Sequence, residues 1–112
     1  MVIRRVVPDV AAEDVAGAAD FYVRLLGFEV GMDLGSIVTL VSPSNPTAQI
    51  TLQTGATPNL TVEVDDVDTV HRAALERGVE VVYPLTDEPW GVRRFFVRDP
   101  TGLVVNVMQH ES

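Results

Sequence analysis

The sequence predicts an α+β domain of two βαβββ repeats, in which curved mixed sheets surround a cleft and each repeat carries one helix on the outside. The first observation is a repeat: DVAGAADFYVRLLGFEV and DVDTVHRAALERGVEV share one order of aspartate, amphipathic helix, glycine and strand. The second is that one apolar segment precedes each helix and three follow it, separated by turn-forming residues. We therefore expect a single domain over residues 1–112, with repeat one at about 1–54 and repeat two at about 59–110.

The first repeat begins with an alternating segment at residues 3–10, which is typical of a strand. Asp14 then suits an N-cap, the apolar residues from Val15 to Leu26 recur at helical spacing, and Gly27 is placed to end the helix. Strands are expected at 28–33, 37–41 and 48–53, because DLGS and SPSNPT supply the turns between them.

The second repeat has the same order. A strand is expected at residues 60–64, Asp66 caps a helix that Gly78 ends, and strands follow at 79–83, 92–97 and 103–109. The segments PLTDEP and RDPTG mark the turns, and TGATPN links the two repeats. Each helix covers one face of its sheet, so the opposite faces must be buried or curve around a ligand.

Composition limits the possible functions. The chain is 46% hydrophobic, carries a formal net charge of −8, and has no cysteine. The charge argues against nucleic acid, which needs a positive surface, and the lack of cysteine excludes disulfides and thiolate chemistry. No apolar run is long enough to span a membrane, and the first residues do not resemble a signal peptide. We expect a cytoplasmic protein that binds neither nucleic acid nor membrane.

Three motifs, FYVRLLGFEV, the Asp65-Asp66-Val67 cap of the second helix, and DPTG leading into the last strand, together resemble the vicinal oxygen chelate superfamily. This is the group of glyoxalases, bleomycin-resistance proteins and extradiol dioxygenases. The resemblance spans nearly the whole chain and implies the fold. Because one scaffold hosts several reactions as well as binding proteins, it leaves the activity open.

The resemblance also implies four strand positions that hold a divalent metal in the family's enzymes. At these positions this chain has Val7, Thr51, Asn59 and Asn106. Valine has no donor atom, and neutral hydroxyl and amide oxygens are weak ligands without charged partners. The two histidines, His71 and His110, lie elsewhere. We therefore expect no metal and no cofactor. The chain then resembles the bleomycin-resistance branch, in which metal-free homodimers sequester a drug.

Strand alternation predicts which side chains face the cleft. If Asn106 faces it, Val104, Met108 and His110 do so too. An even loop after the seventh strand would add Arg93 and Phe95, whereas an odd loop would add Arg94 and Phe96. The Trp-Gly-x-Arg pattern of the family favours Arg93. The remaining residues expected at the ligand are Val7, Asp9, Thr51, Asn59, Thr61, Glu63 and Trp90, with Gln49 and Gln53 on the same face.

Several roles stay open at this point. Asn106 could contact a ligand or bond to Asn59, Trp90 could be a lid or an edge residue, and Arg93 could bind an anion or pair with Glu63 or Asp9. The excess negative charge could favour cationic ligands.

The leading hypothesis is a homodimeric protein, with paired or swapped halves, that binds an aromatic or drug-like molecule such as an antibiotic. One alternative is a lyase, isomerase or dioxygenase-like enzyme that uses Arg93 with Glu63, Asp9 or His110. Another is a non-catalytic interaction module.

Overall fold

A computed structural model describes residues 1–111 and contains eight strands and two helices among them. The strands of the first repeat are β1 (Ile3–Ala11), β2 (Glu29–Asp33), β3 (Ile37–Val41) and β4 (Gln49–Gln53), and its helix is α1 (Val15–Leu26). The second repeat has β5 (Leu60–Val64), α2 (Val67–Glu76), β6 (Val81–Glu88), β7 (Val92–Arg98) and β8 (Val104–His110). The chain order is thus βαβββ twice, which confirms the predicted fold class.

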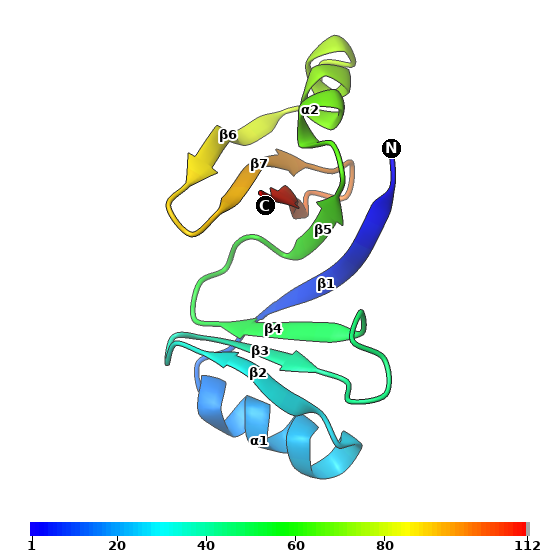
Figure 1. The fold of residues 1–112 in the computed structure, drawn as a ribbon. Coiled ribbons are helices and arrows are strands. Elements are labelled where there is room, and N and C mark those ends of the chain that lie inside the picture. The colour runs from blue at the N-terminus through cyan, green and yellow to red at the C-terminus, as the bar shows by residue number, and fades with distance from the viewer. Residues whose placement is uncertain (112) are drawn as a thin grey trace.

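The strands form one sheet in the order β2-β3-β4-β1-β5-β8-β7-β6. Each repeat has the same internal order, because β1 pairs in parallel with β4 just as β5 pairs in parallel with β8. The two repeats meet where β1 pairs antiparallel with β5. Figure 1 shows the consequence: α1 and α2 lie at opposite ends of the molecule, with the strands between them.

Both helices begin where the capping aspartates predict. The Asp14 carboxylate accepts a hydrogen bond from the Gly17 N–H at 2.9 Å, and Asp66 accepts one from the Thr69 N–H at 3.2 Å. Such caps satisfy backbone donors that the first turn of a helix leaves free. Gly27 ends α1 with a φ of 80°, a left-handed conformation that glycine adopts without steric cost.

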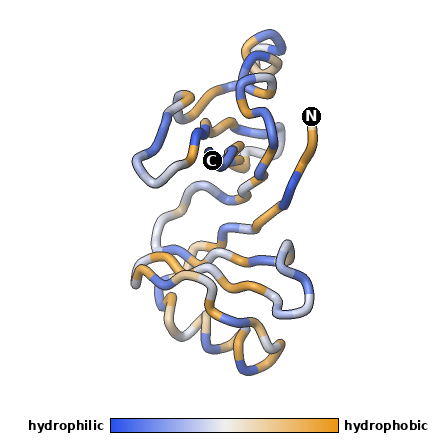
Figure 2. The backbone as a smooth tube through the Cα atoms, in the orientation of Figure 1, coloured by the Kyte–Doolittle hydropathy of each residue, from blue (hydrophilic) through white to orange (hydrophobic). Residues whose placement is uncertain are grey.

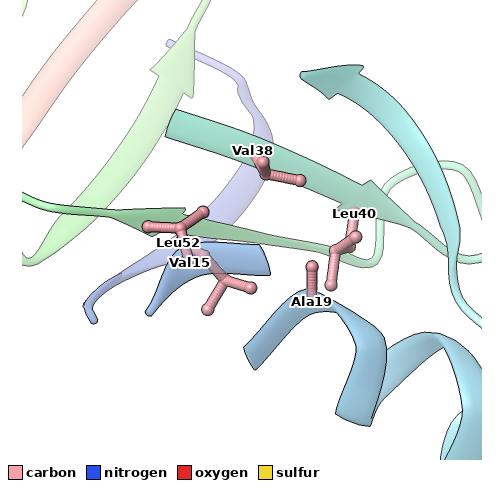
Figure 3. Close-up of a cluster of buried hydrophobic side chains, with 5 residues drawn as sticks. All are labelled: Val15, Ala19, Val38, Leu40 and Leu52. Atoms are coloured by element: carbon pink, nitrogen blue, oxygen red, sulfur yellow. The ribbon is translucent and has the colours of Figure 1, made fainter. Parts of the chain in front are cut away.

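Each helix packs on its own half of the sheet and makes a separate core. In the first, Val15 and Ala19 of α1 contact Val38, Leu40 and Leu52 of β3 and β4 (Figure 3). In the second, α2 packs on a cluster formed by Val64, Val67, Ala74, Phe95 and Val107. Hydrophilic and hydrophobic residues alternate along several strands (Figure 2), so these strands have one apolar face for the helix and one more polar face.

One element differs from its predicted position. A strand was expected at residues 79–83, followed by a turn at PLTDEP, but β6 runs from Val81 to Glu88 and includes Pro84. β6 is an edge strand, where proline is tolerated because one side of the strand has no partner to bond. No helix within residues 1–111 is both long and apolar enough to cross a membrane.

Candidate functional site

The side of the sheet opposite the helices carries a cleft of about 410 Å³. Both repeats contribute to its wall: β1 to β4 provide one side, and β7, β8 and the turn between β6 and β7 provide the other. The lining residues are Arg5, Gly31, Met32, Thr39, Val41, Gln49, Trp90, Val92, Arg94, Asn106, Met108 and His110. The cleft thus lies where the meeting of two repeats predicted it.

The pairing of β7 with β8 decides which of their side chains reach the cleft. Phe96 lies opposite Asn106, and Arg94 lies opposite Met108. Paired residues of antiparallel strands point to the same face, so Arg94 and Phe96 share the face of Asn106. The prediction that Arg93 and Phe95 face the cleft is therefore wrong.

The cause is the turn that begins at Asp99. The Asp99 N–H donates to the Leu103 carbonyl oxygen at 2.8 Å, which leaves three residues between the paired positions. This odd loop shifts β7 by one residue, and a shift of one residue turns every side chain to the other face. Phe95 is fully buried under α2, and Arg93 pairs with Asp68 and Asp87 on the helix side.

Arg94 is held in place on several sides. Its guanidinium carbon lies 5.5, 5.2 and 4.9 Å from the ring centres of Tyr83, Trp90 and Phe96. Its Nε and Nη2 atoms both contact Glu88, at 2.8 and 2.7 Å, and Tyr83 donates a hydrogen bond to the same carboxylate. Cation–π contacts and an ion pair together fix a side chain that would otherwise be flexible.

A second ionic group lies on β1, β5 and β8. Arg5 donates from Nε to Glu63 and from Nη1 to Gln49, and the Nδ1 atom of His110 lies 3.0 Å from the other oxygen of Glu63. Burial raises the pKa of Glu63, but the hydrogen bonds with His110 and Arg5 outweigh it and leave the pKa below its usual value. Glu63 is therefore an ionised carboxylate that positions Arg5 and His110.

A row of polar side chains runs across the middle strands behind the cleft. The Thr61 hydroxyl donates to Asp9 at 2.7 Å, and the amide nitrogen of Asn106 donates to the Thr61 oxygen at 3.2 Å. A hydroxyl has one proton, which Thr61 gives to the ionised carboxylate, so it can only accept from Asn106. This fixes the orientation of the Asn106 amide. Its Oδ1 atom is buried and has no hydrogen-bond partner among residues 1–111.

Asp9, the acid of this row, has a strongly shifted pKa. Burial raises its pKa from 3.8 to about 6, although hydrogen bonds from Thr61 and Thr51 and the charge of Arg5 act in the opposite direction. Its side chain is almost entirely covered, and it does not line the cleft. Asp9 therefore connects to the cleft indirectly, through Thr61 and Asn106.

Asn59 has a different position from the one predicted. Its Oδ1 atom accepts from the Val104 N–H at 2.9 Å, and its amide nitrogen donates to the Ala56 carbonyl at 3.1 Å. The side chain thus takes part in the backbone pairing at the start of β5 and β8. Its amide is used there and is not directed at a ligand or at Asn106.

The predicted ligand-binding residues fall into three groups. Trp90, Asn106 and Met108 line the cleft. Val7, Asp9, Thr51, Thr61 and Glu63 lie on the same face of the sheet but form its covered floor or support Arg5. Asn59, Arg93 and Phe95 serve the fold instead.

Sequence reasoning missed several lining residues. Arg5 could have been found, since it alternates with Val7 and Asp9 along β1. Met32, Thr39 and Val41 come from β2 and β3, whose contribution depends on how strongly that end of the sheet curves. No local signal in the sequence reports this curvature.

A comparison with known families decides the family. The model of the Glyoxalase/Bleomycin resistance protein/Dioxygenase superfamily matches residues 3–107, nearly the whole chain. The protein belongs to this superfamily. The motifs in the sequence of this chain therefore predicted the family correctly. No curated protein matches the chain.

Several solved structures share the fold. A superfamily member from Vibrio splendidus 12B01 has a TM-score of 0.78 at 21% identity, over 97% of this chain and 99% of its own. The Mn(II)-bound glyoxalase from Novosphingobium aromaticivorans has a TM-score of 0.71 at 19% sequence identity. The match covers 96% of this chain and 38% of the glyoxalase chain. Methylmalonyl-CoA epimerase from Streptomyces coelicolor has a TM-score of 0.67 at 16% sequence identity. The match covers 98% of this chain and 97% of the epimerase chain. At these identities the likeness shows the fold alone, and both enzymes and binding proteins remain compatible with it.

The superfamily implies a divalent metal, but the donors of this chain do not fit one. Val7 has no donor atom, the Asn59 oxygen already accepts from Val104, and Thr51 and Asn106 are neutral. Within residues 1–111 there is no group of three or more His, Cys, Asp or Glu side chains that could hold a metal ion. Divalent metals require imidazole, thiolate or several anionic oxygens, which this arrangement does not provide.

Proposed function

We propose that the protein binds a small organic ligand in the cleft between its two repeats, without a metal ion and without converting the ligand. An aromatic or drug-like molecule suits the cleft, because a volume of about 410 Å³ falls within the range of small-molecule sites. The lining combines aromatic and apolar surface at Trp90, Val92 and Met108 with polar groups at Thr39 and Asn106. This mixture provides contact area together with a few oriented hydrogen bonds.

The observation that carries the proposal is the buried Oδ1 atom of Asn106, which has no hydrogen-bond partner within residues 1–111. A buried acceptor without a partner costs about 1–3 kcal/mol, because it has lost its water and gained nothing in return. A ligand that donates a hydrogen bond to this atom would recover that energy. In the resemblance that the motifs suggest, this is the position of a metal-binding glutamate, so a neutral acceptor here favours a molecule over a cation.

A thermal-shift screen tests the proposal. Purified protein is titrated with Zn²⁺, Ni²⁺, Mn²⁺ and Fe²⁺, and separately with glycopeptide antibiotics, aromatic antibiotics and aromatic metabolites. We expect some organic compounds to raise the melting temperature by mass action and the metals to leave it unchanged. Asn106→Ala should weaken the organic ligands. Stoichiometric metal in the purified protein, with a melting temperature that a chelator lowers, would overturn the proposal.

A second candidate is an enzyme that uses the same cleft without a metal. The raised pKa of Asp9, about 6, is the observation that favours it, since a carboxyl group with such a pKa can exchange protons near neutral pH. Its position behind Thr61 weighs against direct contact with a substrate. To distinguish the binding protein from the enzyme, the protein is incubated for a long time with a compound that it binds, and the compound is then recovered and analysed. Unchanged compound supports a binding protein, and a product that Asp9→Asn no longer forms supports the enzyme.

A further inference from the structure

Basic side chains line the cleft, whereas their acidic partners lie behind its surface. Among residues 1–111, its lining side chains include Arg5, Arg94 and His110 but no aspartate or glutamate. The carboxylates that pair with them lie behind, since the side chains of Glu63 and Glu88 are only 14% and 8% exposed. In a chain with a net charge of −8, this cleft therefore presents cationic hydrogen-bond donors to whatever enters it.

Both arginines keep donors that no other group in the described part of the chain uses. Arg94 contacts Glu88 through Nε and Nη2, and Arg5 bonds to Glu63 and Gln49 through Nε and Nη1. The second amino group of each guanidinium takes no part in these bonds. Guanidinium groups match carboxylates in shape and charge, and an arginine already held by a carboxylate and by aromatic rings loses little freedom on binding.

An aromatic surface lies beside these donors. Trp90, the only tryptophan of the chain, lines the cleft and is 61% exposed, and Arg94 lies 5.2 Å from its ring centre. A flat ring system could therefore stack near Trp90 while its charged group reaches Arg94. Asn106 lines the same cleft, and its buried Oδ1 atom has no hydrogen-bond partner among residues 1–111.

We propose that the ligand is an aromatic organic anion, a carboxylate that binds to Arg94 and Arg5 and donates a hydrogen bond from a neighbouring hydroxyl or amino group to Asn106. This inference rests on the proposed binding function and names its ligand class. It differs from the expectation that the acidic chain favours cations, because the local placement of the arginines, and not the net charge, sets the chemistry of the cleft. A cationic group would face two guanidinium groups there.

Three matched compounds test the charge. Hydroxynaphthoate, the neutral hydroxynaphthamide and the corresponding cationic amine share a ring system and a hydroxyl group and differ in charge. Binding is followed by Trp90 fluorescence and by the indole signal in ¹H–¹⁵N spectra, both of which report on the cleft alone because no other tryptophan exists. We expect the carboxylate to bind at least 10-fold more tightly than the amide, on the order of one charge-assisted hydrogen bond, and the amine more weakly still.

The variants separate Arg94 from its neighbour. Arg94→Met alone would leave Glu88 buried with Tyr83 as its one remaining side-chain partner among residues 1–111, so it is combined with Glu88→Gln to keep the fold. This double variant should lose the preference for the carboxylate over the amide. Arg93→Met is the matched control: it removes an arginine from the adjacent position on the opposite face, and it should leave all three affinities unchanged.

The outcomes distinguish this inference from the proposed function. If the Trp90 signals show that the amide or the amine binds as tightly as the carboxylate or more tightly, the proposal of an anionic ligand is overturned. The proposed binding function would still stand. A preference for the carboxylate that the Arg94→Met/Glu88→Gln variant retains also overturns it. If none of the three compounds binds, the inference is wrong. Metal binding, as tested above, would instead overturn the proposed function itself.

Discussion

Phe96 lies directly opposite Asn106 across β7 and β8, which places Phe96 and Arg94 on the cleft face of the sheet and turns Phe95 and Arg93 toward α2. The two adjacent phenylalanines thus have different environments, as do the two adjacent arginines. The turn that begins at Asp99 causes both differences. The same relationship explains why a change at one position should affect stability and a change at the next should affect binding.

The two phenylalanines provide the first prediction. Phe95→Ala should lower the free energy of unfolding by about 3–5 kcal/mol, because it removes a fully buried ring and leaves a cavity under α2. Phe96→Ala should cost clearly less, since that ring lies at the partly exposed cleft face. Urea unfolding at equilibrium measures both. Equal losses for the two variants would contradict the register of β7.

The two asparagines should also behave differently. Asn59→Ala leaves the Val104 N–H and the Ala56 carbonyl without their partner, so we expect a loss of about 1–3 kcal/mol in unfolding free energy. Asn106→Ala removes an amide whose oxygen is already unpaired, so its effect on unfolding should be smaller. The same urea series compares them. A larger loss for Asn106→Ala would argue that its amide serves the fold and not a ligand.

Asp9 should make stability depend on pH. Its pKa in the folded protein is about 6, above the usual 3.8, so between these values the folded state holds a proton that the unfolded state has lost. Stability therefore falls as pH rises from about 4 to about 6 and changes little from this group above that, with a total on the order of 3 kcal/mol.

Asp9→Asn should remove this dependence and should raise stability at pH 8 relative to the unchanged protein, since no charge is then buried. Unfolding free energies measured in urea across the pH range check this. Thr61 can still donate to the new amide oxygen, so the hydrogen bond at that position is retained. An unchanged pH profile in the variant would show that Asp9 is not the group responsible.

We also predict a homodimer in solution. Several large apolar side chains are exposed on the described chain, among them Phe21, Leu25 and Leu26 of α1 and Val30 of β2. Exposed apolar surface of this kind is often covered in an assembly. Light scattering after gel filtration should give about twice the 12.2 kDa of one chain. A mass of one chain at every concentration would contradict the prediction.

Much of the fold could be predicted from local patterns. The caps at Asp14 and Asp66, the glycine that ends α1, and the alternation along β5 and β8 are properties of short segments, and each appears in the structure as expected. The repeat then placed the cleft between the two halves. The length of β6 was not predictable, because proline and turn-forming residues signal a loop unless the strand is known to lie at an edge.

The sequence by itself determined the fold class, the superfamily, and the absence of charged donors at the four positions that the resemblance implies for a metal, because these depend on residue identity and local spacing. Tertiary structure alone decided which face each arginine occupies and which polar atoms stay free. The odd turn at Asp99 sets the register of β7, and the pairing of Arg94 with Glu88 and of Arg5 with Glu63 joins residues from different strands. Such contacts depend on how strands are paired and curved, so no single segment contains the information that would predict them.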